Sequence, residues 1–254
     1  MVKPMEISTE DYRALVRDKY NGDQHADLSA DIARLAHGEP LAYVIGWQPF
    51  LGLAIDLSTR PLIPRPETEW WTELLIQALK KQYPSAPFTL LDLCSGSGAI
   101  GLAVAHACPN ASVVLSDIEE THRSAIEKTM HHNALDASRI EVVAGDLFAP
   151  VAERRFNIIA TNPPYVPDAR ELPQSVSDFE PAAALFAGSD GLSFVRRIAR
   201  EAPAHLLPGG MLWLECDTTH TGEAEALLKS GGASSTAINE DLYGRPRIVV
   251  SYYA

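Results

Sequence analysis

The chain has 254 residues, of which 46% are hydrophobic and 21% are charged. This composition is ordinary for a soluble globular protein, and the length suits one large domain, with or without a small appendage. Lys and Arg total 21 against 33 Asp and Glu, so the formal net charge is −12. Such a charge argues against sequence-independent binding to DNA or RNA, because that binding depends on neutralising phosphates.

The sequence carries no recognisable targeting or metal-binding signal. Its first residues lack the apolar core of a signal peptide, and no apolar run reaches the roughly 18 residues of a membrane span. Cys94, Cys108 and Cys216 are odd in number and have no CxxC spacing, so they indicate neither a disulfide framework nor a zinc site. We therefore expect a reduced cytoplasmic enzyme with no resident metal and no membrane contact.

The first part of the chain predicts helices, then a hairpin. Apolar residues recur at helical intervals within 9–37, and apolar residues alternate with small or polar ones from Leu53 to Leu57. Pro61, Pro64 and Pro66 then predict a stiff extended connector, because proline removes backbone donors and fixes φ. We divide the chain into a small helical region (1–46), a hairpin with its connector (47–66) and a main domain (67–254).

From residue 68 onward, predicted helices alternate with short apolar strands. The strands are expected at 88–93, 112–117, 140–146, 156–162, 210–216, 234–239 and 247–253. Such alternation is typical of an α/β domain with a mostly parallel sheet covered on both faces. Since no helix separates the last two strands, we expect them to form a hairpin, with the final strand antiparallel at or near the edge.

A glycine-rich loop between a strand and a helix is the first motif with chemical meaning. Residues 92–101 read DLCSGSGAIG and contain GxGxxG, which is typical of dinucleotide-binding turns. Glycine lets the backbone approach a ligand, and the helix start offers free N–H groups. The motif alone is weak evidence, because a tight turn with small packing residues gives the same pattern.

An acidic residue follows at the end of the next strand. Asp117 lies 19 residues after Gly98, where a carboxylate can accept both hydroxyls of a ribose. This spacing fits NAD and S-adenosylmethionine equally, and an aspartate capping the following helix is the structural alternative.

The segment 161–165, TNPPY, distinguishes these cofactors. The side-chain carbonyl of Asn162 and the backbone carbonyl of Pro163 can converge on a planar –NH2 group, which has two donors, and Tyr165 offers it a flat surface. Hydride transfer has no use for two acceptors on an amide, so we favour S-adenosylmethionine over NAD.

These motifs together resemble the HemK/PrmC family of class I S-adenosylmethionine-dependent methyltransferases, and the resemblance runs from about residue 36 to the C-terminus. Besides the glycine loop, Asp117, Gly145-Asp146-Leu147 and NPPY, it is carried by GEPLAY (38–43), LIPRPETE (62–69), FEP (179–181), ALF (184–186), Gly188, DGL (190–192), DLYG (241–244) and Arg247.

The resemblance implies a Rossmann-like fold with a seven-stranded, mostly parallel sheet whose final strand is antiparallel. It also implies transfer of a methyl group to the amide nitrogen of a protein glutamine, with S-adenosylhomocysteine as the other product. In the PrmC branch that glutamine lies in the Gly-Gly-Gln motif of class 1 peptide-chain release factors, so translation termination is the expected process. In the PrmB branch it belongs to a large-subunit ribosomal protein. LAYVIG and ALFAGSDGL favour the PrmC branch, and we expect a monomer without direct nucleic-acid contact.

The same resemblance assigns roles to particular residues. The catalytic residues are Asn162, Pro163 and Tyr165. The cofactor-binding residues are Asp92, Cys94, Ser95, Gly96, Ser97, Gly98, Asp117, Ile118, Asp146, Leu147 and Asn162. The substrate-binding residues are Asn162, Pro163, Pro164, Tyr165, Glu180 and Arg65. Asp117 is expected at the ribose, Asp146 at the adenine amino group and Leu147 against its ring.

The sequence departs from the family pattern in three places. Cys94 stands where many members have glycine, which requires that this position keep a negative φ. The segment 216–222 differs from the usual pattern and receives no role. The helical region of about 45 residues is shorter than the family's docking domain.

Two other functions remain open at this stage. An adenine-specific nucleic-acid methyltransferase would use NPPY on a flipped base, although the net charge of −12 and the lack of a recognition domain disfavour it. A non-catalytic binding module is disfavoured by the intact NPPY.

Overall fold

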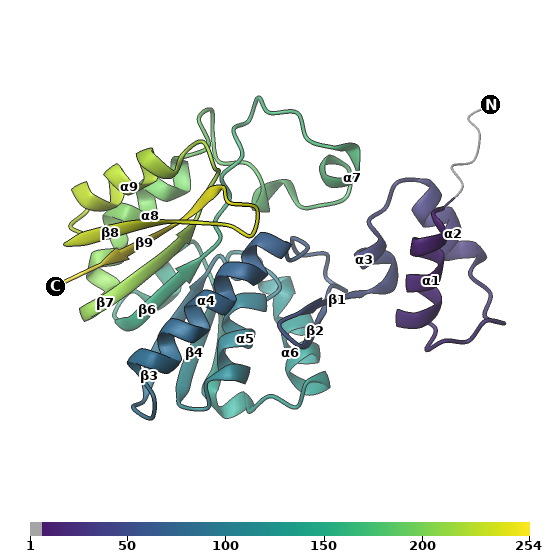
Figure 1. Ribbon diagram of the computed structural model, residues 1–254, viewed down its shortest axis with the longest axis horizontal. Coiled ribbons are helices and arrows are strands. Elements are labelled where there is room, and N and C mark those ends of the chain that lie inside the picture. The colour runs from purple at the N-terminus through teal and green to yellow at the C-terminus, as the bar shows by residue number, and fades with distance from the viewer. Residues whose placement is uncertain (1–6) are drawn as a thin grey trace.

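The computed structural model describes residues 7–254 (Figure 1). Residues 1–6 of the predicted helical region lie outside the described residues. That region contains α1 (Thr9–Asp18), α2 (Ser29–Ala36) and α3 (Leu41–Ile45). These helices pack around a small core of their own, Leu15, Val16, Leu28 and Val44, and lie beside the main domain.

A buried carboxylate ties this helical region together. Asp31 on α2 is 4% exposed and pairs with Lys19 Nζ at 2.7 Å, while Tyr20 Oη donates to it at 2.7 Å. The Lys19 ammonium also donates to the carbonyl of Val44 on α3. Such a charge is tolerated inside because each oxygen has a charged or hydroxyl partner.

The predicted hairpin connects the helices to the main domain. β1 (Trp47–Phe50) and β2 (Leu53–Asp56) pair antiparallel, and Leu53 and Ile55 point into the main core. The other edge of β2 lies on α6 (Arg123–His132), where the Asn133 side chain exchanges two hydrogen bonds with the backbone of Ala54.

The main domain is the predicted α/β sheet. Seven strands lie in the order β5-β4-β3-β6-β7-β9-β8. They are β3 (Phe88–Leu93), β4 (Ala111–Asp117), β5 (Ile140–Ala144), β6 (Phe156–Thr161), β7 (Leu206–Glu215), β8 (Ser235–Glu240) and β9 (Pro246–Tyr252). The first five strands in this order are parallel, whereas β9 is antiparallel to both β7 and β8. The prediction of a terminal hairpin is confirmed.

Consecutive strand residues point to opposite faces of the sheet, so each face acquires its own core. Leu90 and Ile158 pack under α4 (Pro66–Gln82), α5 (Ala99–Ala107) and α6. Leu91 and Ile159 pack under α8 (Ser193–Glu201) and α9 (Thr221–Ser230). The continuous apolar strands of the sequence follow from this burial on both faces. A short helix, α7 (Gln174–Ser177), lies in the long segment between β6 and α8.

One strand differs from its predicted form. The strand predicted at 210–216 begins earlier, since β7 already starts at Leu206 and includes Pro208-Gly209-Gly210. The register against β6 shifts between Phe156 and Ile158, so the extra residues form a bulge inside the strand.

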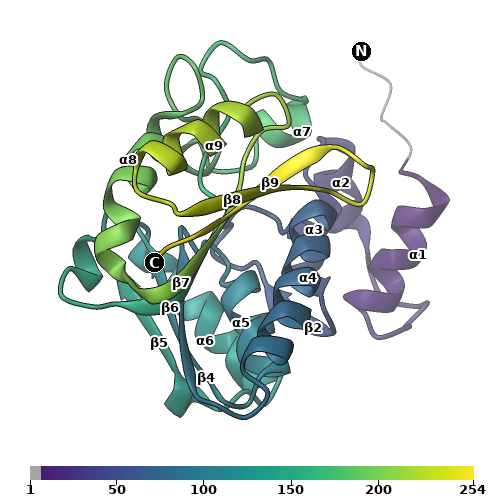
Figure 2. The same ribbon diagram turned by 60° about the vertical axis from the view of Figure 1, so that its left-hand side comes forward.

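The topology brings the candidate motifs to one edge. β3 and β6 are adjacent and parallel, with Leu93 opposite Thr161, so the loops that follow them leave the sheet side by side. From β3 the chain adds β4 and β5 on one side of the sheet, and β6 and β7 on the other side. Where the strand order reverses in this way, a crevice forms at the carboxyl ends of the parallel strands, and ligands bind there. Figure 2 shows the β8–β9 hairpin reaching over the start of α4, where Arg245 pairs with Glu67 at 2.9 Å. Within residues 7–254, none of the helices has the length and apolarity that a membrane crossing requires.

Candidate active site

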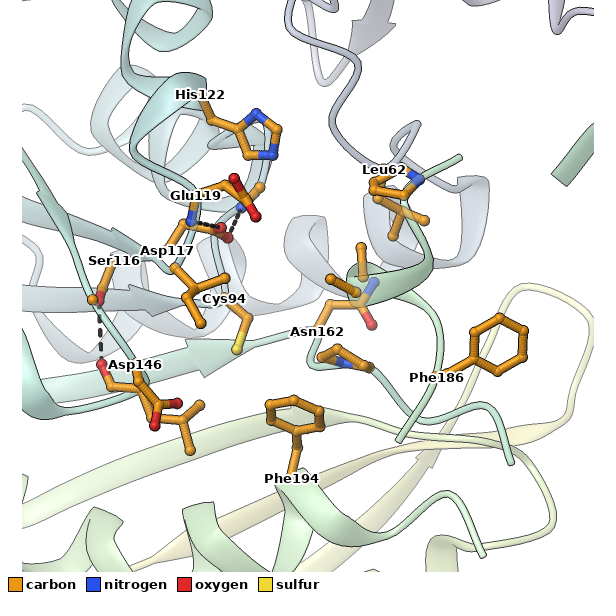
Figure 3. Close-up of a pocket in the computed structure, with 18 residues that line it drawn as sticks. Leu62, Cys94, Ser116, Asp117, Glu119, His122, Asp146, Asn162, Phe186 and Phe194 are labelled. Atoms are coloured by element: carbon orange, nitrogen blue, oxygen red, sulfur yellow. Dashed lines mark hydrogen bonds between the residues drawn. The ribbon is translucent and has the colours of Figure 1, made fainter. Parts of the chain in front are cut away.

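A pocket opens at the carboxyl edge of the sheet, between the loops that follow β3, β4, β5 and β6 (Figure 3). Its wall includes eight of the residues predicted from the sequence: Cys94, Gly96, Asp117, Ile118, Asp146, Leu147, Asn162 and Pro164. These residues come from four separate strand ends. The sheet topology therefore assembles the motifs into a single site.

The other eight predicted residues are not part of this wall. Four belong to the glycine loop or to the strand before it, namely Asp92, Ser95, Ser97 and Gly98. The other four are Pro163, Tyr165, Arg65 and Glu180, of which Pro163 and Tyr165 flank the wall residue Pro164.

The glycine loop is held by hydrogen bonds to the neighbouring strand. Gly96 N donates to Asp117 Oδ2 at 2.7 Å, and Ser95 N donates to the carbonyl of Ser116 at 3.0 Å. Below the loop, Gly101 N donates to Asp92 Oδ2 at 2.8 Å. Gly101 also allows the helix to pack closely on the sheet, since a Cβ there would lie 2.3 Å from Leu115 Cδ2. The loop is thus fixed before any ligand binds.

Two buried polar atoms beneath the loop have no partner among the described residues, namely Asp92 Oδ1 and Ser95 Oγ. Burial raises the pKa of Asp92 to about 7, and the nearby Asp117 charge acts in the same direction. Such unpaired groups are costly in a folded protein and are typical of functional sites.

Cys94 departs from the expected backbone conformation. The sequence required a negative φ for a cysteine at this position, but φ is +59°, so that expectation is wrong. The left-handed region costs a residue with a Cβ roughly 1–2 kcal/mol. The turn out of β3 imposes this conformation, which explains why glycine suits the position.

We expect Cys94→Gly to be more stable than Cys94→Ala by about 1 kcal/mol, because alanine retains the Cβ that the left-handed conformation disfavours. Both variants lose the sulfur, so their difference isolates the backbone effect. Urea unfolding of the two proteins measures it. Equal stability, or a more stable alanine variant, would contradict a strained Cys94.

The pocket is acidic at one end. Figure 3 shows Asp117 and Glu119 on one side of the pocket, Asp146 below them and Asn162 on the opposite side. Arg197 pairs with Asp146 at 2.7 Å and lowers its pKa. Among the described residues that form the wall there is no Lys or Arg. Such a pocket repels phosphates and suits a ligand with a positive charge, hydroxyls or amino groups.

The rest of the wall is largely apolar. Ile118 is 63% exposed at the pocket, and the remaining apolar side chains on the wall are those of Leu62, Cys94, Leu147, Pro164, Pro181, Ala183, Ala184, Phe186 and Phe194. Apolar walls with few polar groups are typical of small-molecule sites, in which the polar groups set the orientation of the ligand.

Asn162 lies on the pocket wall directly after β6. Its Nδ2 donates to Thr68 Oγ1 at 3.2 Å, and the Thr68 hydroxyl donates to Glu215 Oε2 at 2.7 Å. Tyr165 Oη donates to the other oxygen of the same carboxylate at 3.2 Å. Burial and the Glu215 charge raise the pKa of Tyr165 far above its usual value, so its hydroxyl remains a donor.

Arg65 and Glu180 form an ion pair on the substrate side of the pocket, in which the Glu180 side chain is buried. Arg65 Nη2 lies 2.6 Å from Glu180 Oε1, and Ile63 N donates to Glu180 Oε2 at 3.1 Å. This carboxylate joins the proline-rich connector to the segment after NPPY. It thereby places Leu62 and Pro181 on the pocket wall.

The residues behind Asn162 and several residues of the wall were not predicted from the sequence. Glu215 carried a signal, because it lies next to the end of the strand predicted at 210–216, much as Asp117 ends its own strand. Thr68 carried none beyond its place in LIPRPETE. The wall also contains residues to which no individual role was assigned from the sequence. Leu62, Gly145, Pro181, Ala184 and Phe186 stand in the motifs quoted above, whereas Ser116, Glu119, His122, Ala183 and Phe194 do not.

Comparison with known proteins gives consistent matches. The family model of the methyltransferase small domain matches residues 67–193. A release factor glutamine methyltransferase from Bordetella pertussis is 38% identical over 224 residues, which cover 87% of this chain and 80% of the relative. One from Lactococcus lactis is 30% identical over 248 residues, covering 96% of this chain and 88% of the relative.

Among solved structures, a methyltransferase from Pyrococcus furiosus is similar with a TM-score of 0.56 and 17% identity. The match covers 88% of this chain and 98% of the other. Likeness at this level of identity supports the fold alone.

Proposed function

The chain belongs to the family of release factor glutamine methyltransferases, and from this membership we propose that it methylates the side-chain amide nitrogen of a protein glutamine. The proposed methyl donor is S-adenosylmethionine. The proposed substrate is the glutamine of the Gly-Gly-Gln motif in a class 1 peptide-chain release factor. The observation that carries the proposal is Asn162, which lies on the pocket wall opposite the acidic end formed by Asp117 and Glu119.

The wall of the pocket fits S-adenosylmethionine better than a phosphate-bearing nucleotide. Asp117, Glu119 and Asp146 supply negative charge, and the cofactor carries an ammonium group, a sulfonium and two ribose hydroxyls but no phosphate. We assign Asp117 to the ribose, Asp146 to the adenine amino group and Leu147 to its ring. The backbone of Gly96 faces the methionine portion, above the unpaired Ser95 Oγ.

When bound, S-adenosylmethionine supplies a methyl group on a positively charged sulfur, a strong electrophile because a neutral thioether, S-adenosylhomocysteine, leaves. The glutamine nitrogen is a poor nucleophile, since its lone pair is delocalised into the carbonyl. Orientation by the protein is therefore the main requirement, and it can contribute about 7–11 kcal/mol in ideal cases.

Asn162 and Pro163 meet this requirement in the proposal. Asn162 Oδ1 and the Pro163 carbonyl accept the two protons of the glutamine –NH2 group, which holds the nitrogen in line with the methyl group. The same two acceptors stabilise the positive charge that grows on nitrogen as it attacks. Tyr165 packs against the amide. A general base is not needed before the methyl group is transferred, because the methylated nitrogen releases its extra proton to water after the neutral thioether has left.

The remaining parts of the chain hold the protein substrate. We propose that α1, α2 and α3, in the helical region 1–46, dock the release factor. The segment after NPPY, fixed by Arg65 and Glu180, shapes the entrance for the glutamine. Arg170 forms a second ion pair with Asp217 at this segment, which gives the 216–222 loop a structural role.

Three further expectations about partners and location remain predictions. The net charge of −12 supports the absence of direct nucleic-acid contact. A monomeric state and a cytoplasmic location are tested by light scattering and by fractionation.

A methyl-transfer assay with labelled S-adenosylmethionine tests the function. The substrates are a purified class 1 release factor, its Gly-Gly-Ala variant and adenine-containing DNA. The proposal expects label on the unaltered release factor alone. Label on DNA would replace it with adenine methylation. Cofactor binding without label on the factor would move the substrate to the large-subunit ribosomal protein of the PrmB branch, which is then added as a further substrate.

A further inference from the structure

A chain of hydrogen bonds lies directly behind Asn162, on the side away from the pocket. It links Asn162 Nδ2 to Thr68 Oγ1 at 3.2 Å and Thr68 Oγ1 to Glu215 Oε2 at 2.7 Å. Trp71 Nε1 donates to the same Oε2 at 2.6 Å. Thr68, Trp71 and Glu215 are 4%, 0% and 1% exposed, so bulk water does not compete for these bonds.

The direction of the bonds in this chain follows from the groups around Glu215. Trp71 donates to Oε2, Tyr165 donates to Oε1, and the Arg247 guanidinium lies 3.9 Å from Oε1, so the carboxylate is surrounded by donors and acts as an acceptor. An indole N–H can only donate, so Glu215 Oε2 must be an acceptor. The Thr68 hydroxyl, which contacts the same oxygen, therefore gives its single proton to Glu215. The lone pairs of the Thr68 oxygen remain available, and only a hydrogen-bond donor can satisfy them. The group of Asn162 that faces Thr68 must then be its –NH2.

This direction decides which end of the Asn162 amide meets the pocket. The oxygen and nitrogen of an asparagine amide are nearly identical in shape, so packing alone does not distinguish the two orientations. With the nitrogen held by Thr68, Oδ1 is the end left to face the substrate. Within residues 7–254 no donor is hydrogen-bonded to Oδ1. A reversed amide would present two donors to a substrate –NH2 group, which also donates.

We propose that Thr68, backed by Glu215 and Trp71, is a positioning residue that holds the Asn162 amide with its oxygen toward the substrate. This inference rests on the proposed function, because it concerns the acceptor that receives the glutamine –NH2 protons. Glu215 holds two residues of the NPPY motif. Its Oε2 is linked to Asn162 through Thr68, and its Oε1 accepts a hydrogen bond from Tyr165. The carboxylate therefore aligns NPPY as a unit, although it lies behind the pocket wall.

Thr68→Val tests the inference, since valine keeps the shape of threonine and removes the hydroxyl. We expect kcat to fall about tenfold, as for loss of one hydrogen bond of ordinary strength, while KM for the protein substrate and the Kd of S-adenosylmethionine change less than threefold. Thr68→Ser restores the hydroxyl and is expected to return kcat to about the wild-type value. If Thr68→Val does not fold, Thr68→Ala carries the same test.

Thr72→Val is the matched control. Thr72 lies one turn further along α4, is 0% exposed and donates its hydroxyl to the carbonyl of Thr68 at 2.7 Å. It receives the same chemical change in the same helix without touching Asn162, so its kcat is expected to stay within twofold of wild type. An equal loss in Thr72→Val and Thr68→Val, or no loss in Thr68→Val, would overturn the proposal.

A measurement without catalysis separates this inference from the proposed function. The side-chain amide protons of Asn162 are assigned by ¹⁵N NMR as the pair missing in Asn162→Ala. In the wild type we expect one of them to be protected from exchange, with that protection lost in Thr68→Val and regained in Thr68→Ser. Unchanged protection overturns the inference whatever the substrate. Protection as expected, with no methylation of any glutamine, would instead count against the proposed function.

Discussion

Substitution of Asn162 by alanine is expected to lower kcat for glutamine methylation by about 10²–10³-fold, the range seen when one preorganised polar group is removed from a catalytic site. The alanine variant loses the side-chain acceptor that orients the glutamine nitrogen and stabilises its growing charge. The acidic end of the pocket lies on the opposite side and remains intact. We therefore expect the Kd of S-adenosylmethionine to change less than about threefold.

Single-turnover kinetics with saturating cofactor, together with titration calorimetry, measure the two effects separately. Thr161→Val serves as a neighbouring control, because its hydroxyl donates to the carbonyl of Leu93 at 2.7 Å and Thr161 is not part of the pocket wall. A parallel loss of cofactor affinity and kcat in Asn162→Ala would show that Asn162 holds the cofactor and has no separate catalytic role.

Substitution of Asp117 by alanine has the largest expected effect on cofactor binding. A carboxylate that accepts two ribose hydroxyls makes two charge-assisted hydrogen bonds, each about 1.5–3 kcal/mol, so the Kd of S-adenosylmethionine is expected to rise at least about 10²-fold. Asp117 also accepts the backbone N–H of Gly96 at 2.7 Å. The alanine variant therefore loosens the glycine loop as well.

Two related variants separate these contributions. Asp117→Asn retains an acceptor for Gly96 N but loses the charge, and it is expected to bind more weakly than wild type and more tightly than Asp117→Ala. Asp146→Ala removes a half-exposed aspartate with a single assigned contact, and about a tenfold loss is expected. Calorimetry that gives Asp117→Ala the wild-type Kd would refute the ribose assignment.

Much of the fold could be predicted because the apolar patterns are strong. Continuous apolar runs such as 88–93 and 156–161 are buried on both faces, which only a covered parallel sheet provides. The bulge in β7 could not be predicted, since Pro208 and Gly209 are ordinary turn residues and only the pairing with β6 draws them into the strand.

The part of the site that could be predicted consists of residues at strand ends. Asp117 and Asn162 each follow an apolar run, and parallel strands bring such positions to one edge of the sheet. Thr68 could not be assigned in this way. It lies inside a helix, and its partner Glu215 is 147 residues away in the sequence. The two meet because the start of α4 packs against the end of β7, where Trp71 stacks on Trp213.

The sequence also did not predict that aromatic residues line the pocket. Phe186 lies in the long segment between β6 and α8, where no hydrophobic period distinguishes a wall residue from a surface residue. Phe194 lies in the first turn of α8, and its place on the wall depends on how that helix packs on the sheet. The backbone conformation of Cys94 could not be predicted from the sequence for a different reason. A cysteine with φ of +59° contradicts local preference, so the residue type does not reveal the conformation of the turn after β3.

The most direct test of the proposed activity is to locate the methyl group by fragmentation mass spectrometry. A class 1 release factor is incubated with this protein and S-adenosylmethionine, digested and sequenced across its Gly-Gly-Gln motif. We predict a single added methyl group on the side chain of that glutamine, present with the wild-type protein and strongly reduced with Asn162→Ala. A methyl group on another residue type, or equal modification by both proteins, would contradict glutamine methylation directed by Asn162.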